Sequence, residues 1–77
     1  MIDDNRQLSE LTDRQLEILA AATRGLTTSD IARQLDISVS GVLKHFTVIF
    51  EKLGVANRTE AVALALTRQM LKAAGRH

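Results

Sequence analysis

Residues 27–47 read TTSDIARQLDISVSGVLKHFT, and this stretch decides the fold of the chain. A helix begins at Thr27, because Asp30 three residues later gives the acidic form of a capping box. A short turn follows, and Ser38 is the candidate N-cap of a second helix. The residues of the two predicted buried faces recur at helical spacing and are Ile31, Ala32 and Leu35, then Val42, His45, Phe46, Ile49 and Leu53. A short helix, a tight turn and a second helix can place one helix in the major groove of DNA.

Turn and capping signals predict one further helix on each side of this pair. Upstream, residues 12–15 (TDRQ) form a capping box, and Gly25 is a left-handed stop. Downstream, Gly54 is a second stop, and residues 57–60 (NRTE) are another capping box by position. The predicted apolar face of the upstream helix consists of Leu16, Leu19, Ala20 and Thr23, with Ile18 and Ala22 beside them and Leu11 placed to pack on Leu16.

Strand-like alternation of apolar and polar residues does not persist anywhere in the sequence. The fold class that we predict is therefore all-α, a four-helix domain that contains a helix-turn-helix. We expect this domain to occupy residues 11–74. Residues 1–10 are predicted to be an N-terminal arm or linker, and residues 75–77 a C-terminal tail.

Composition excludes several classes of function. The chain has 77 residues, no cysteine, a net charge of +1 and only two histidines, so we expect no metal site. It has no cysteine nucleophile, no glycine-rich phosphate loop and no histidine–carboxylate cluster, so we expect neither enzyme activity nor a cofactor. No apolar run reaches the roughly 18 residues that a membrane span needs. We therefore expect a cytoplasmic protein without a membrane partner.

The identities of individual residues are more specific than the helical pattern. They occur in a fixed register: Leu11, Thr12, Arg14, Gly25-Leu26-Thr27, Ile31-Ala32, Leu35, Ile37-Ser38, Val42, His45, Ile49, Lys52-Leu53-Gly54-Val55 and Arg58-Thr59-Glu60-Ala61-Val62. This series closely resembles the LuxR-type helix-turn-helix domain, also called the GerE or NarL/FixJ type, over residues 11–71. The resemblance implies a dimer joined through the last helix and a role in transcription regulation in a bacterium.

The resemblance also implies which residues contact DNA. The helix-turn-helix motif corresponds to residues 28–47, with base-reading positions at Leu43, Lys44 and Thr47. Phosphate-contacting positions of the family map onto Thr27, Thr28, Ser38 and Ser40. These four positions lie near helix starts, where free backbone N–H groups and the positive dipole end favour phosphate.

The sequence departs from the family pattern within the second helix of the motif. The family usually has threonine at Gly41 and lysine at Leu43, and often asparagine at Val48 and a basic residue at Glu51. Gly41 weakens the helix by up to about 1 kcal/mol relative to alanine. Leu43 replaces a cation with an apolar side chain that suits a thymine methyl group. We expect these departures to change DNA affinity and operator sequence but not the fold.

The last helix carries more apolar residues than one buried face needs. At ~100° per residue, Ala61, Val62 and Ala65 mark its core side. Leu66 and Met70 flank that side in one direction, and Leu64 and Leu71 flank it in the other. We expect a homodimer interface at Ala63, Leu66 and Met70.

These observations favour a sequence-specific, DNA-binding transcription regulator that binds double-stranded DNA in the major groove. Such a chain could be a stand-alone regulator or the output domain of a response regulator or quorum-sensing protein, with RNA polymerase as a candidate further partner. The alternative is a helix-turn-helix module that binds a partner regulator, an idea motivated by Leu43, Val48 and the low charge of the second motif helix. A sigma-factor-like domain is disfavoured by the LuxR-type register.

Four further side chains have expected roles. We expect Lys44 to face outward and His45 to be packed. Arg14 and Arg58 are candidates for structural pairing as much as for phosphate contact.

Overall fold

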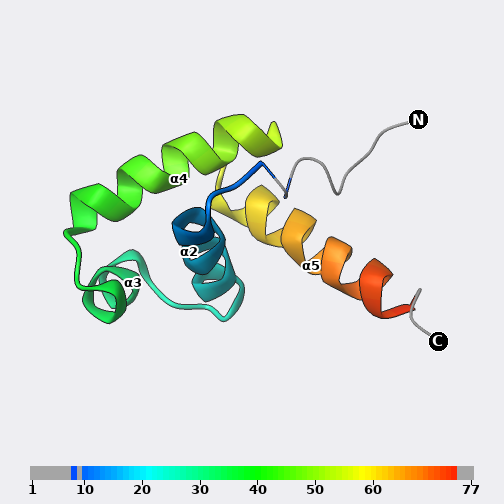
Figure 1. Ribbon diagram of the computed structural model, residues 1–77, viewed down its shortest axis with the longest axis horizontal. Helices are drawn as coiled ribbons and strands as arrows, with labels where there is room; N and C mark the ends of the chain where they lie inside the picture. Colours follow the sequence, from blue (N-terminus) through cyan, green and yellow to red (C-terminus); the bar gives the residue numbers. More distant parts are fainter. Residues whose placement is uncertain (1–7, 9, 75–77) are drawn as a thin grey trace.

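The computed structural model describes residue 8 and residues 10–74, and describes side chains as far as residue 68. In this described part of the chain, four α-helices follow one another: α2 (Asp13–Thr23), α3 (Thr28–Leu35), α4 (Val39–Leu53) and α5 (Arg58–Ala74). The described residues contain no strand, which confirms the all-α, four-helix prediction. Figure 1 shows α2 in the middle of the fold, and α2 packs against α3, α4 and α5.

Three of the predicted helix starts have the predicted capping bonds. The Thr12 hydroxyl accepts from the Gln15 backbone N–H at 3.1 Å, and the Gln15 side chain accepts from the Thr12 N–H at 3.0 Å. The Thr27 hydroxyl accepts from the Asp30 N–H at 3.0 Å, and the Asp30 carboxylate accepts from the Thr27 N–H at 3.2 Å. Ser38 caps α4 by accepting from the Gly41 N–H at 2.9 Å. These bonds satisfy backbone donors that have no partner within the helix.

The start of α5 differs in part from the predicted capping box. The Asn57 side chain accepts from the Glu60 N–H at 2.9 Å, as a helix cap should. The Glu60 carboxylate, however, accepts from the N–H of Ala56 at 2.7 Å, one residue before the expected donor. The reciprocal half of the box is therefore displaced into the preceding turn.

Two helices end at the predicted glycines. Gly25 follows α2 with φ of 85°, and Gly54 caps α4 with φ of 69°. Residues with a side chain are disfavoured at such angles, which explains the glycines there. Asp36 ends α3 in the same left-handed region, with φ of 57°. Aspartate tolerates this conformation better than most residues, so the turn between α3 and α4 needs no glycine.

The core lies where α2, α3, α4 and α5 meet. Its buried apolar side chains are Leu11, Ile18, Leu19, Ala21, Ala22, Ile31, Ala32, Val42, Phe46, Ile49, Leu53 and Ala61. The faces predicted for α3 and α4 are largely confirmed, with Leu35 and His45 only half-buried. Phe46 and Phe50 stack with ring centroids 5.6 Å apart.

The predicted apolar face of α2 was wrong in part. Leu16 is 40% exposed and Ala20 is also exposed, whereas Gln15 is buried with Ile18, Leu19 and Ala22. The physical reason is that the Gln15 amide has two internal partners, the Thr12 N–H and the Lys52 ammonium. With Gln15 turned inward, the buried residues of α2 are Gln15, Ile18, Leu19, Ala21 and Ala22.

Two cations, Lys52 and Arg58, make long-range contacts that hold the helices together. The Lys52 Nζ, at the end of α4, donates to the Glu10 carbonyl at 3.0 Å and to Gln15 Oε1 at 3.1 Å. The Arg58 guanidinium, at the start of α5, donates to the Leu26 carbonyl and lies 5.4 Å from the centre of the Phe46 ring. A guanidinium over an aromatic face is attracted by the ring quadrupole. Arg58 therefore links the loop before α3 to the core ring of α4.

We predict that Thr27→Ala lowers the free energy of unfolding by about 1 kcal/mol, because an alanine leaves the α3 N-cap without its side-chain acceptor. Urea denaturation followed by circular dichroism measures the change. Thr47→Ala is the matched control, since Thr47 lies exposed in the middle of α4 and caps no helix start. The capping account would fail if both variants lost the same stability.

Candidate nucleic-acid interface

The turn between α3 and α4 fixes the relative position of the two motif helices. The Ile37 N–H donates to the Ala32 carbonyl at 3.0 Å, directly after the left-handed Asp36. The Ile37 side chain packs against the core. The turn is thus held by two contacts of Ile37, one from its backbone N–H and one from its apolar side chain. These contacts explain why so few residues are enough to change the direction of the chain.

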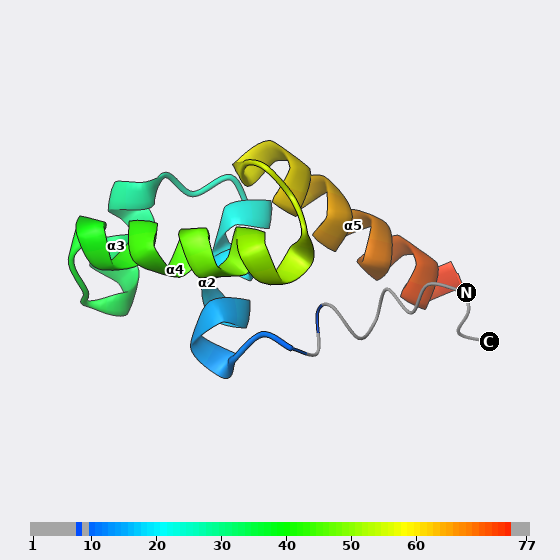
Figure 2. The same cartoon turned by 90° about the horizontal axis from the view of Figure 1, so that it is seen from above.

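Only one long face of α4 is buried. Val42, Phe46, Ile49 and Leu53 fill that face. Figure 2, seen from above, shows α4 as an outer element that crosses in front of α2. The exposed residues of α4 before its last turn are Val39, Ser40, Leu43, Lys44, Thr47 and Val48, a group that we call the open face. A helix with an open face of this kind can enter the major groove, which admits an α-helix.

The base-reading positions implied by the resemblance all lie on the open face. Leu43 is 52% exposed, and Lys44 and Thr47 are exposed on the same helix. The Thr47 hydroxyl donates to the Leu43 carbonyl at 3.1 Å, so its proton is used within the helix. Lys44 is the single cation of the open face. Lys52, in the last turn of α4, is bound to Glu10 and Gln15.

The phosphate positions gather at the starts of α3 and α4. Thr27 and Ser38 are the N-caps of these helices, and Ser40 is exposed in the first turn of α4. The Ser38 and Ser40 hydroxyl oxygens lie 3.3 Å apart. Thr28 is half-buried at the first position of α3. The capping bonds use one lone pair of each of the Thr27 and Ser38 hydroxyls.

The two helix starts differ in charge. Hydrogen bonds from the Thr27 backbone N–H and side chain, together with Arg33 at 3.5 Å, hold the pKa of Asp30 below its usual 3.8. Asp30 is therefore a carboxylate at neutral pH and offsets the positive end of α3. The first turns of α2 and α5 contain Asp13 and Glu60, but the first turn of α4 contains no acidic residue. Of the four described helices, α4 thus presents the most favourable start for an anion.

Gly41 has a local reason beside the Ser38 cap. A Cβ at position 41 would lie 3.1 Å from the Ser38 hydroxyl oxygen, which is closer than most real contacts of that kind. The threonine that is usual in the family would therefore require Ser38 to shift by a few tenths of an ångström. Glycine costs helix propensity but leaves the capping bond undisturbed.

The arginines singled out in the sequence have protein partners. Arg14 pairs with Glu17 at 3.8 Å on the surface of α2, and Arg58 is half-buried against Phe46. The role of Lys52 was missed by sequence reasoning. A basic residue in the last turn of a helix is common, and nothing in the sequence indicates that its partners lie 37 and 42 residues away.

The outer side of α5 carries the residues predicted for a dimer. Ala61 is fully buried, and Val62, Leu64 and Ala65 pack against the core. Ala63 is exposed and Leu66 is 40% exposed. The side chain of Met70 lies outside the described residues. Of the two described flanking leucines, Leu64 thus packs against the core, whereas Leu66 is exposed.

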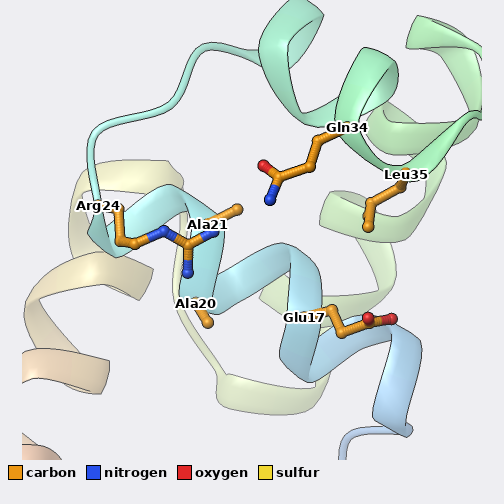
Figure 3. A pocket seen from close by; sticks show the side chains of 6 residues that line it. All are labelled: Glu17, Ala20, Ala21, Arg24, Gln34 and Leu35. Carbon is orange, nitrogen blue, oxygen red and sulfur yellow. The ribbon is translucent and has the colours of Figure 1, made fainter.

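A shallow depression between α2 and α3 lies apart from the open face. Its lining consists of Glu17, Ala20, Ala21, Arg24, Gln34 and Leu35 (Figure 3). Among the residues that the structure describes, no group of three or more histidine, aspartate or glutamate side chains could hold a metal ion. No helix in the same part of the chain is long and apolar enough to cross a membrane.

Comparison with known proteins identifies the motif independently. A family model described as bacterial regulatory proteins, luxR family, matches residues 9–65. The chain is 36% identical over 66 residues to the transcriptional regulatory protein YdfI of Bacillus subtilis, which covers 86% of this chain and 31% of that protein. It is 46% identical over 57 residues to the probable transcriptional regulatory protein SgaR of Hyphomicrobium methylovorum, covering 74% of this chain and 27% of that protein.

A third relative is the transcriptional regulatory protein DesR of Bacillus subtilis, 39% identical over 62 residues, with 80% of this chain and 31% of that protein covered. The chain therefore spans less than a third of the length of these relatives. No solved structure matches the chain significantly. Since the family model covers more than half of the sequence in the register of the described helices, the chain belongs to the luxR family of bacterial regulatory proteins, a family of DNA-binding transcription regulators.

Proposed function

We propose that this chain binds double-stranded DNA with the open face of α4 in the major groove. The observation that carries the proposal is the exposure of that face on a helix-turn-helix of the luxR family, with Lys44 directed outward. Leu43, Lys44 and Thr47 would meet base edges. Phosphates on either side would be bound by the hydroxyls and backbone N–H groups near Ser38 and Ser40, and by Thr27 and Thr28 at the start of α3.

The charge of the surface sets the expected strength of binding. The chain has a net charge of +1, and the open face contributes a single lysine. We expect about two to four phosphate contacts per monomer, and therefore a shallow dependence of affinity on salt. Base contacts must then supply a larger share of the affinity for the preferred sequence than in a strongly basic domain.

The proposal includes a homodimer through the outer side of α5. Ala63 and Leu66 are exposed there, and Met70 follows Leu66 at helical spacing. A two-fold axis would present two copies of α4 to successive major grooves about 34 Å apart, one helical turn of DNA. The preferred operator would then be roughly palindromic. The isolated domain can dimerise weakly, with the two half-sites on DNA completing the association.

The lengths of the relatives support a proposal about the regulator in which the chain acts. Because it corresponds to less than a third of those proteins, we propose that it acts as the DNA-binding domain of a cytoplasmic bacterial regulator, with RNA polymerase as a further partner. The names of the relatives favour transcription regulation and do not favour the alternative of a module that binds only a partner protein. The luxR family is not a class of enzymes, and we propose no catalytic role.

We predict that Lys44→Ala weakens DNA binding by roughly ten-fold at moderate salt, because a charged contact is lost from the groove-facing surface. Fluorescence anisotropy with a random-sequence duplex at several salt concentrations measures both affinity and salt slope. If Lys44 contacts phosphate, the slope decreases by about one unit. Arg14→Ala is the control, since Arg14 lies on α2 beside Glu17 and should matter much less. Unchanged affinity and slope for Lys44→Ala would show that the open face does not meet DNA.

We predict that Leu66→Glu abolishes cooperative binding to a duplex with two half-sites, because a charge replaces an apolar contact at the two-fold axis. Binding to one half-site and helicity by circular dichroism should stay unchanged. Leu16→Glu is a matched control, since Leu16 is equally exposed, at 40%, but lies on α2. Cooperative binding by Leu66→Glu, or its unfolding, would remove Leu66 from the dimer interface.

A further inference from the structure

We infer that the open face of α4 recognises thymine by its methyl group, and that operators of this protein carry thymines at the positions that Val39, Leu43 and Thr47 meet. This inference rests on the proposed function and names the base that the same surface selects. It is carried by the distribution of hydrocarbon on the surface of the chain.

Exposed hydrocarbon is concentrated on α4. Among the described side chains, five large apolar residues are exposed, and three of them, Val39, Leu43 and Val48, lie on this helix. Their exposed fractions are 44%, 52% and 37%. Leaving one such residue in water is common, but three on the one helix whose family function is to touch DNA call for a specific contact.

Three side chains form a row along the helix. Val39, Leu43 and Thr47 follow one another at steps of four residues, which places each about 6 Å beyond the last on nearly the same side. The row is therefore about 12 Å long, comparable to three or four base pairs at ~3.4 Å each. The Thr47 hydroxyl donates to the Leu43 carbonyl, so the donor is used and the methyl group is what this side chain adds to the row.

The chemistry of the groove selects one base for such a row. In the major groove, guanine, adenine and cytosine present hydrogen-bonding groups, whereas thymine adds the 5-methyl group. An apolar side chain against an unpaired donor or acceptor leaves that group without a partner, at a cost. When an apolar side chain instead meets a methyl group, hydrocarbon of both the protein and the base is buried. Lys44, the one cation on the face, lies beside the row and can bind one polar edge or a phosphate without changing this preference.

The experiment replaces thymine by uracil, which removes the methyl group and leaves base pairing intact. A duplex is first selected by the parent protein from a random pool, and is then synthesised with uracil at each thymine of one half-site in turn. We expect binding to weaken about four-fold for each contacted methyl group, as the burial of one methyl group predicts. The control is a duplex with uracil only outside the half-sites, which should bind with the affinity of the selected duplex.

Variants locate the contact. In Leu43→Ala, the loss caused by uracil should shrink to less than two-fold at the thymine that Leu43 meets. Leu43→Lys should raise affinity for random-sequence duplex and should also lose the uracil effect at that same thymine. Leu16→Ala, a matched exposed leucine on α2, should keep the full four-fold effect.

Three negative results are distinguishable. Specific binding with equal affinity for thymine and uracil duplexes overturns the methyl inference and leaves the proposed function in place. Failure to select any preferred duplex overturns the proposed function and the inference together. A Leu43→Ala variant that binds weakly but keeps the parent's uracil effect at every position removes Leu43 from the row and overturns the assignment.

Discussion

The burial of α4 along a single face is the constraint on which the rest of the molecule depends. Val42, Phe46, Ile49 and Leu53 belong to a thin core, and no helix among the described residues covers the other side of α4. A small domain thus has to leave one helix half in solvent. The luxR fold places that half-exposed helix where it can enter a groove, so that the stability of the core and the availability of the binding surface come from the same packing.

Contacts at the flanks keep α4 in place. Near its C-terminus, Lys52 bonds to Glu10 and Gln15, and in its middle Phe46 lies beneath the guanidinium of Arg58. The same arginine donates to the Leu26 carbonyl, directly before the cap of α3. These contacts therefore hold the starts of α3 and α4, which are proposed to meet phosphate, in a fixed position relative to each other. The charges of Lys52 and Arg58 are engaged within the protein. The open face is left with Lys44 and with a helix start that has no acidic residue in its first turn.

Helix boundaries could be predicted because they depend on neighbours in sequence. The caps at Thr12, Thr27 and Ser38 and the stop at Gly54 involve atoms within about one helical turn, and the structure contains all of them. The buried face of α2 could not be predicted in full, because Gln15 turns inward through a partner 37 residues away. The open face followed from the helical period of α4, whereas the roles of its residues toward DNA came from the family register. Nothing local distinguishes a base-reading side chain from a solvated one.

The account is tested most directly by amide chemical-shift mapping of the ¹⁵N-labelled chain during titration with a selected duplex. It predicts that the largest changes cluster at residues 27–28 and 38–48, with smaller changes along the buried side of α4. Changes confined to the depression lined by Glu17, Arg24 and Gln34, or to the outer side of α5, would contradict the claim that α4 is the surface that meets DNA.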